Sequence, residues 1–197
     1  MNRWQKQAIS NYQLLFDELN EIQTTVFVSF SEDIESARRK FAEQLFWFFV
    51  YGFDDCILEL ELDGNDWNTP NGYEYLDQTY SDGESTLQKF DKYYNNKDSA
   101  SLKKVFETEA HRMYNEGAKQ AVNKVKETNN SILNGFSKTW HTMMDDKVRD
   151  THFFLENETV PIEEDFYTFD GDYAPLPHFF QNDENNINCR CIVTYGR

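Results

Sequence analysis

The sequence predicts an α+β protein, with a mainly helical N-terminal two-thirds followed by a small compact α+β C-terminal domain of short strands. Apolar residues recur every three to four positions as far as about residue 126, which is the period of an amphipathic helix. Beyond residue 135 the pattern becomes β-rich. The 197 residues include 17 Phe, 11 Tyr and 4 Trp but only 8 Gly and 4 Pro, so a folded chain with an aromatic core is expected rather than a disordered or repetitive one.

Two helices are predicted before residue 55. An apolar stripe predicts a first helix over about 3–25. Ser29 and Glu32 have the spacing of a capping box ahead of a second helix over about 34–50, which Gly52 and the aspartates after it are expected to end. The segment 56–62 alternates apolar and acidic residues, so it is predicted as a strand, with a longer helix as the alternative.

An acidic, turn-rich segment separates these helices from the next two. Residues 63–84 hold Gly, Pro, Asp and Asn but break the ligand order of an EF-hand, so a solvated loop is expected. A short helix is predicted over 85–94. A long helix, capped by Asp98 or Ser99, is predicted to run from there to about residue 126.

These elements suggest two regions. Residues 1–100 form a helical N-terminal region, and residues 101–197 hold the long helix over 99–126 followed by a compact module over 135–197. On the long helix, His111 is predicted to be solvated or paired locally. The module is predicted to contain strands within 136–144, 166–169 and 191–195, and one or two helical turns within 145–154.

The charge balance limits the partners. Lys and Arg number 19 against 35 Asp and Glu, which gives a net charge of −16. With no basic cluster along the sequence, direct binding to duplex DNA is not expected, nor is binding to an anionic membrane. No apolar run approaches the length of a membrane span, and the N-terminus lacks the pattern of a secretion signal. Three cysteines, two of them two residues apart, suggest a reducing compartment rather than a disulfide framework.

The uncommon residues of the C-terminal third follow one another in a distinctive order. Trp140 comes first, then Asp146 with Val148, Arg149 and His152, then Val160-Pro161, and last the run Asn188, Cys189, Arg190 and Cys191. This order resembles the phage head morphogenesis family, the minor head proteins of the phage Mu F type. The resemblance covers about residues 102–195. Lys147 stands where the family pattern has Arg, and the loop Pro177–Phe179 lacks the glycines of that pattern.

The resemblance implies a function. Members of this family are minor capsid proteins of the virion, present in few copies. They associate with the portal or other capsid proteins, and they act in head assembly or in DNA packaging and ejection. It also implies no established catalytic activity, no cofactor, and a place in the phage head after assembly in the host cytoplasm.

A catalytic alternative uses three residues of the same run. Asp146, Arg149 and His152 are spaced three apart, so on a short helix they would share a face and could serve a small hydrolase or transferase as acid, anchor and base. We favour a structural interpretation, in which Arg149 or Arg190 pairs with Asp146 in a buried cluster that holds the final domain together.

The cysteines allow two further interpretations. With His152, and with His178 or an aspartate as a fourth ligand, Cys189 and Cys191 could bind zinc, and with His152 and an aspartate either could act as a nucleophile. A single C-x-C is a weak zinc signal. We therefore expect that no metal binds, and that Cys189 and Cys191 are small buried residues on the same face of a strand. Trp140 is expected to belong to the core.

Overall fold

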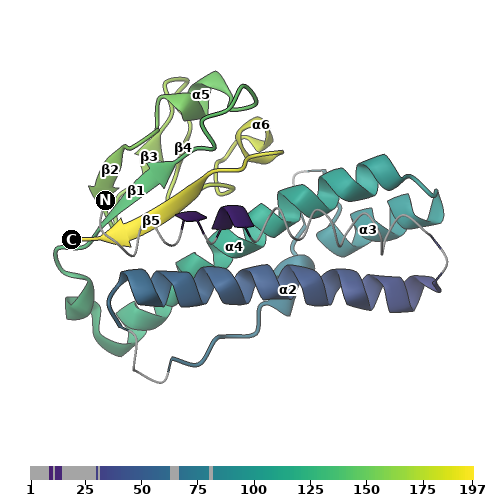
Figure 1. The fold of residues 1–197 in the computed structure, drawn as a ribbon, viewed down its shortest axis with the longest axis horizontal. Coiled ribbons are helices and arrows are strands. Elements are labelled where there is room, and N and C mark those ends of the chain that lie inside the picture. Colours follow the sequence, from purple (N-terminus) through teal and green to yellow (C-terminus); the bar gives the residue numbers. More distant parts are fainter. Residues whose placement is uncertain (1–8, 11, 15–29, 31, 63–66, 80–81) are drawn as a thin grey trace.

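A layer of long helices carries a small β module on one side, and the C-terminus lies at the free end of the last strand (Figure 1). The computed structural model describes residues 9–10, 12–14, 30, 32–62, 67–79 and 82–197. The helices are α2 (Ile34–Glu59), η1 (Tyr73–Leu76), α3 (Thr86–Asn95), α4 (Ser99–Asn129), η2 (Asn130–Leu133), α5 (Asp150–Phe153) and α6 (Asp183–Asn186). The strands are β1 (Ser137–His141), β2 (Thr159–Pro161), β3 (Phe166–Tyr167), β4 (Tyr173–Ala174) and β5 (Ile192–Gly196). The predicted α+β fold class is confirmed.

The helices α2 and α4 run side by side in the same direction and come into backbone contact at two glycines (Figure 1). A Cβ atom added to Gly52 would lie 1.9 Å from the carbonyl oxygen of Tyr114, and one added to Gly117 would lie 2.0 Å from that of Phe49. The two positions are therefore reciprocal: each helix presents a glycine to a carbonyl of the other. This close approach buries the side of α4 that faces α2.

The predicted end of the second helix at about residue 50 was wrong. For the segment 56–62 the strand was wrong and the alternative, a longer helix, is confirmed as far as Glu59. The helix α2 continues through Gly52 to Glu59, and its Cys56 and Ile57 are buried against the module. Gly52 is a contact point between helices here rather than a helix stop. The cap is Asp33, which accepts a hydrogen bond from the Ser36 amide; the predicted cap Ser29 lies outside the described residues.

Two hydrophobic cores lie along the α2–α4 pair. The first joins α2, α3 and α4 through aromatic rings, with Phe41 packed against Phe90 at 4.6 Å and edge-on to Phe106 at 5.5 Å between centroids. The second joins the C-terminal ends of α2 and α4 to the module and includes the fully buried Trp140 and Phe166. Because the same two helices enter both cores, the module is packed directly onto the helical layer.

The module contains two small antiparallel sheets. The larger has the strand order β2-β1-β5, with Trp140 opposite Val193, and the smaller pairs β3 with β4. Two of the predicted strand segments contain β1 and β3, and the third covers β5 except for its last residue, Gly196. The sequence analysis missed β2, β4 and α6, which have only two to four residues each and so carry no periodic signal.

The remaining predicted helices start where their caps indicate. Ser85 forms a capping box with Gln88 at the start of α3, and the Asp98 side chain caps α4. In the first predicted helix, residues 9–10 and 12–14 are helical, and the rest lies outside the described residues. The described part of the acidic loop contains the short helix η1. Within the described chain, none of the helices has both the length and the apolar character that a membrane crossing requires.

Candidate functional site

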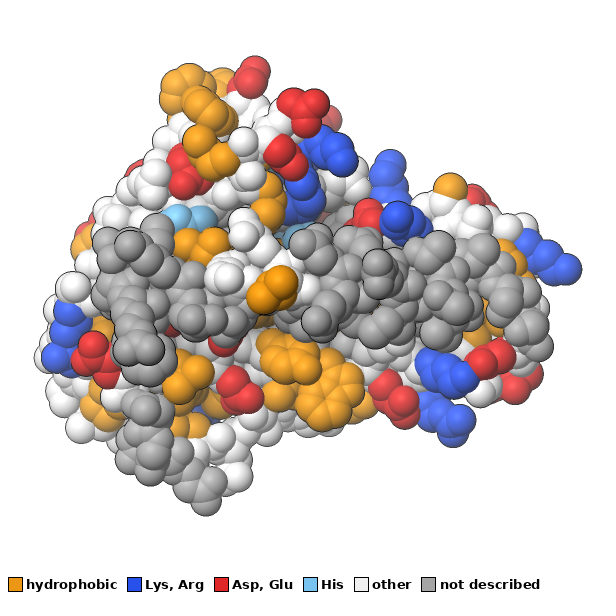
Figure 2. Space-filling view, viewed as in Figure 1, with side chains coloured by type: hydrophobic (Ala, Val, Ile, Leu, Met, Phe, Trp, Pro, Cys, Tyr) orange, Lys and Arg blue, Asp and Glu red, His pale blue; other side chains and the backbone are white. Residues whose placement is uncertain are grey.

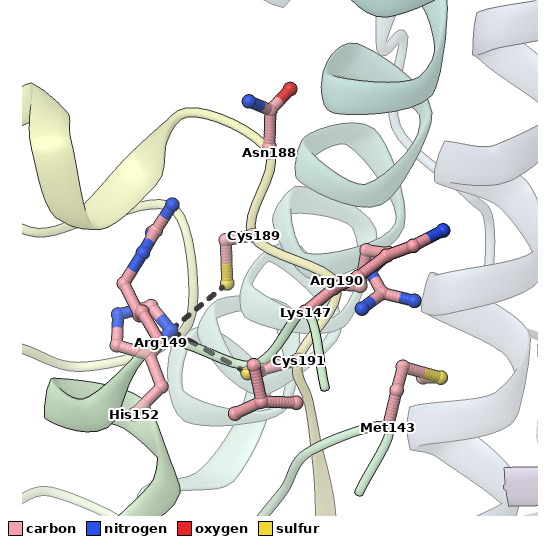
Figure 3. Close-up of a pocket in the computed structure, with 9 residues that line it drawn as sticks. Met143, Lys147, Arg149, His152, Asn188, Cys189, Arg190 and Cys191 are labelled. Atoms are coloured by element: carbon pink, nitrogen blue, oxygen red, sulfur yellow. Dashed lines mark hydrogen bonds between the residues drawn. The ribbon is translucent and has the colours of Figure 1, made fainter. Parts of the chain in front are cut away.

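The site lies where α5 meets the extended segment that leads into β5 (Figure 3). His152 comes from α5, and Cys189 and Cys191 come from the segment before β5. Alternate side chains of an extended chain point in opposite directions. Both thiols therefore face the His152 ring, whereas Arg190 between them turns away to pair with Asp145 (Figure 3).

The three facing atoms are close and shielded from solvent. The His152 Nδ1 atom lies 3.5 Å from the Cys189 sulfur and 3.6 Å from the Cys191 sulfur. The three side chains are only 2–3% exposed. Trp140 packs edge-on to the His152 ring at 5.5 Å, and Phe180 stacks on it at 5.3 Å. These rings fix the orientation of the imidazole.

The two thiols differ in acidity. Burial alone raises the pKa of Cys189, but its interactions with Cys191, His178 and His152 outweigh burial and hold that pKa well below the usual range. The hydrogen bond with Cys189, followed by burial, raises the pKa of Cys191 well above the usual range.

Asp146 does not join Arg149 and His152 as predicted. The helix α5 begins at Asp150, so Asp146 lies before it and is exposed, and Arg149 is its N-cap residue. The three residues therefore share no helical face.

The arginines also have other partners than predicted. Arg190 makes a bidentate ion pair with Asp145, at 2.6 and 2.7 Å, in place of the predicted pair with Asp146. Arg149 Nη2 donates a hydrogen bond to the carbonyl of Ile187 at 2.5 Å. Arg149 thus connects the start of α5 to the segment that carries the cysteines. Arg190 instead pairs with Asp145, which lies in the exposed turn before α5.

His111 is buried, so the prediction of a solvated histidine was wrong. It hydrogen-bonds through Nδ1 to the hydroxyl of Tyr12, and its ring stacks on His178 at 6.3 Å. Burial lowers the pKa of His111 well below its usual range, so the ring is neutral. The middle of α4 is covered by the module, and this tertiary contact was not visible in the helix pattern.

Three polar contacts fasten the module to the helices. Glu59, at the end of α2, accepts a hydrogen bond from the Tyr195 amide at 2.6 Å. Asn115 in α4 donates one to the Cys191 carbonyl at 3.3 Å, and Thr108 lies within hydrogen-bonding distance of Asn188. Burial raises the pKa of Glu59 well above its usual range. The cysteine segment is thus held on the face of α4.

Asp172 organises the chain ahead of the cysteines, and the sequence analysis did not assign it a role. Its carboxylate accepts hydrogen bonds from the amides of Gln181 and Asn182 at 3.1 and 3.2 Å, and from the Asn185 side chain at 2.8 Å. Burial raises its pKa, but these hydrogen bonds outweigh burial and leave the pKa below its usual value. In the sequence, Asp172 belongs to the run Asp170-Gly171-Asp172, which is typical of a turn and does not by itself indicate this role.

The fold also gathers cations that are scattered in the sequence. A groove of about 990 Å³ lies beside the cysteines. Its charged lining consists of Lys103, Lys104, Lys147, Arg149 and Arg190, with Glu107 paired to Lys103 and Asp145 paired to Arg190. The sequence offered no basic cluster, because these residues come from the start of α4, the turn before α5 and the segment before β5. The groove thus gathers more cations than any stretch of the sequence does, although two of the five are paired with acids in the same lining.

An exposed aromatic patch lies at the end of the module. It consists of Phe153, Phe154 and Phe169, which are 53%, 71% and 65% exposed. Phe154 packs edge-on to Phe153 at 6.2 Å and to Phe169 at 5.5 Å between centroids. Hydrophobic side chains gather at the top of the molecule over α5 in the same view (Figure 2). Three phenylalanines left together in solvent indicate a contact surface.

The arrangement gives the catalytic alternatives little support. The Arg149 guanidinium donates to a backbone carbonyl, and His152 Nδ1 faces two thiols, so neither is directed at Asp146. A nucleophilic cysteine needs access for a substrate, whereas Cys189 is 3% exposed. The cavity at the cluster measures only about 10 Å³, which is room for about one water molecule.

Comparison with known proteins gives one match. The family model described as phage Mu protein F like protein matches residues 76–194, which extend from the end of η1 to β5 and include the whole candidate site. No curated protein and no solved structure matches the chain.

Proposed function

Since the family match covers more than half of the chain, the protein belongs to the phage Mu protein F like family, and we propose that it is a portal-associated minor capsid protein. Family membership indicates a phage head morphogenesis protein that works with other head proteins. The match over residues 76–194 is the observation that carries the proposal. The protein acts as a structural component, in head assembly or in the packaging and ejection of DNA.

The aromatic patch provides the surface for the portal contact. It lies inside the matched region, so it belongs to the part of the chain that defines the family. Burying one phenylalanine contributes about 1.5–3 kcal/mol, so a patch of three is enough to anchor a specific contact. The chain carries a net charge of −16, so a basic rim around the receiving surface favours the encounter.

The test is co-purification with the portal protein of the same phage. The two proteins are co-expressed, the portal is captured, and the bound chain is quantified after size-exclusion chromatography. The patch variant replaces Phe154 and Phe169 with Ser. The control replaces Trp47 and Tyr51, exposed aromatic residues on α2, in the same way. We expect the parent and the control to co-purify with the portal, and the patch variant to be lost.

Two results would contradict the proposal at different levels. Failure of the parent chain to co-purify with the portal removes the portal association. Loss of binding in the control but not in the patch variant keeps the association and moves the contact to α2.

A gene deletion separates the possible roles in the phage. If the protein acts in assembly, cells infected with the deletion phage contain few closed heads. If it acts in packaging or ejection, closed heads form in normal numbers, but they are empty or fail to deliver DNA. Normal yields of infectious particles would contradict both roles.

A further inference from the structure

The cluster of His152, Cys189 and Cys191 has the geometry of a metal site. Its nitrogen and two sulfur atoms all lie within 4.8 Å of one another, and the two sulfur–nitrogen distances are 3.5 and 3.6 Å. With Zn–S bonds of about 2.3 Å and Zn–N bonds of about 2.0–2.1 Å, a tetrahedral zinc ion requires sulfur–nitrogen separations of about 3.6 Å. We propose that these three side chains bind one structural zinc ion and that His178, which lies outside the set of atoms within 4.8 Å of one another, moves in to supply the fourth ligand.

The donor atoms suit zinc. Two thiolates and two imidazoles form one of the standard sets of structural zinc sites, and softer sulfur donors select against magnesium and calcium. His178 interacts with the Cys189 thiol and is 7% exposed. Its Nε2 atom is buried and has no hydrogen-bond partner within the described chain. A buried donor or acceptor without a partner costs free energy, which a metal bond at this atom would offset.

A simple hydrogen-bonded core explains the cluster less well. Thiols are weak hydrogen-bond donors, and both point at the same nitrogen of His152. That nitrogen can make one hydrogen bond in its plane, so the second thiol is left with the other sulfur, a weak acceptor, as its partner. A metal ion placed between the three atoms satisfies all of them at once.

The segments around the cluster are short, so a cross-link between them would stabilise the folded module. The helices α5 and α6 have four residues each, and β3 and β4 have two each, so these segments have few internal hydrogen bonds. The ion would join α5, the loop with His178 and the segment before β5. Structural zinc contributes its binding free energy to folding, most of all in small domains of this kind. This inference rests on the geometry of the cluster and not on the proposed portal contact.

The first test measures metal in the full-length protein. The chain is produced with a removable tag that contains no histidine, and zinc is quantified by plasma mass spectrometry. We expect about one zinc ion per chain in the parent, and a native mass higher by one zinc less two protons. A Cys56→Ser variant is the matched control, because Cys56 is also a buried free thiol but lies outside the cluster.

Variants assign the ligands. Cys189→Ser and Cys191→Ser should lose the zinc, while Cys56→Ser keeps it. His178→Gln should weaken cobalt binding by at least roughly 10–100-fold. A loss of that size follows even when the mutated residue only supports a metal ligand, so the loss of a ligand should not be smaller. Equal binding by His178→Gln would overturn the fourth ligand. Full zinc content in the double variant Cys189→Ser, Cys191→Ser would overturn the site.

Cobalt gives a readout that needs no variant to fold. In the metal-free parent, added Co²⁺ should produce intense thiolate-to-cobalt charge-transfer absorption and the strong visible bands of a tetrahedral site, both abolished by Zn²⁺. Chelation of the metal should lower the melting temperature, and added zinc should restore it. A chain without zinc or cobalt bands overturns the proposal. So does a mass lower by two hydrogen atoms that shows a Cys189–Cys191 disulfide in protein purified with a reductant. None of these outcomes bears on binding to the portal.

Discussion

Replacing Gly117 with Ala tests the close crossing of α2 and α4, because the expected sign is opposite to the usual one. In the middle of a helix, Gly→Ala ordinarily stabilises by about 1 kcal/mol. Here the new Cβ would lie 2.0 Å from the Phe49 carbonyl oxygen and 2.9 Å from the Phe53 nitrogen. A carbon–oxygen contact needs about 3.3 Å, so the helices must separate by roughly 1.3 Å at this point. We expect a destabilisation of about 1–3 kcal/mol, the range of overpacked cores.

Denaturant unfolding followed by far-UV circular dichroism measures this change in the free energy of unfolding. Gly52→Ala should behave like Gly117→Ala, because its Cβ would lie 1.9 Å from the Tyr114 carbonyl oxygen. Lys124→Ala is the control, because Lys124 is an exposed residue of α4 and should change stability by less than about 0.5 kcal/mol. If Gly117→Ala unfolds at the same or a higher denaturant concentration than the parent, the helices do not cross in backbone contact and the described packing is refuted.

Three further predictions concern the module, a half-buried carboxyl and DNA. Arg149→Ala should lower stability by about 0.5–1.5 kcal/mol, because it removes a solvent-exposed hydrogen bond to the Ile187 carbonyl. Lys147→Ala, at an exposed neighbour, should change stability little, and equal melting curves for the two variants would rule out Arg149 as a tie. Burial raises the pKa of Asp55 in the folded chain to about 6. The proton on this carboxyl therefore stabilises the folded chain. This contribution to the free energy of unfolding is fully present below about pH 4 and is lost as the pH rises through about 6. Asp55→Asn should therefore gain stability over the parent above pH 6, by up to about 3 kcal/mol, and a pH-independent difference would refute this. Despite the basic groove, the net charge of −16 predicts no binding to duplex DNA at about 0.15 M salt, and a sub-micromolar gel shift there would contradict it.

The helical layer was predictable because its helices are long and capped. Ser85 and Asp98 marked the starts of α3 and α4, and the apolar stripe of α4 runs for many turns. The same logic failed at Gly52, because a glycine that stops a helix and one that lets two helices touch look alike in one sequence. It failed at His111 because the groups that bury it, Tyr12 and His178, are distant in sequence.

The site was predictable in its members but not in its pairings. The order of uncommon residues singled out Arg149, His152 and the two cysteines, and the fold brings all four together. The ion pair of Arg190 with Asp145 rather than with its neighbour Asp146 depends on a turn of a few residues, which periodicity does not describe. The orientation of both thiols toward one imidazole follows from tertiary structure alone.

The most direct test of the head-protein assignment is quantitative mass spectrometry of purified heads. Heads of the phage that encodes this chain are separated from soluble proteins, and the chain is quantified against the portal and the major capsid protein. The account predicts that the chain is present in few copies per head and in a constant ratio to the portal, in empty and filled heads alike. Heads without the chain, from a lysate in which it is abundant, would contradict the account.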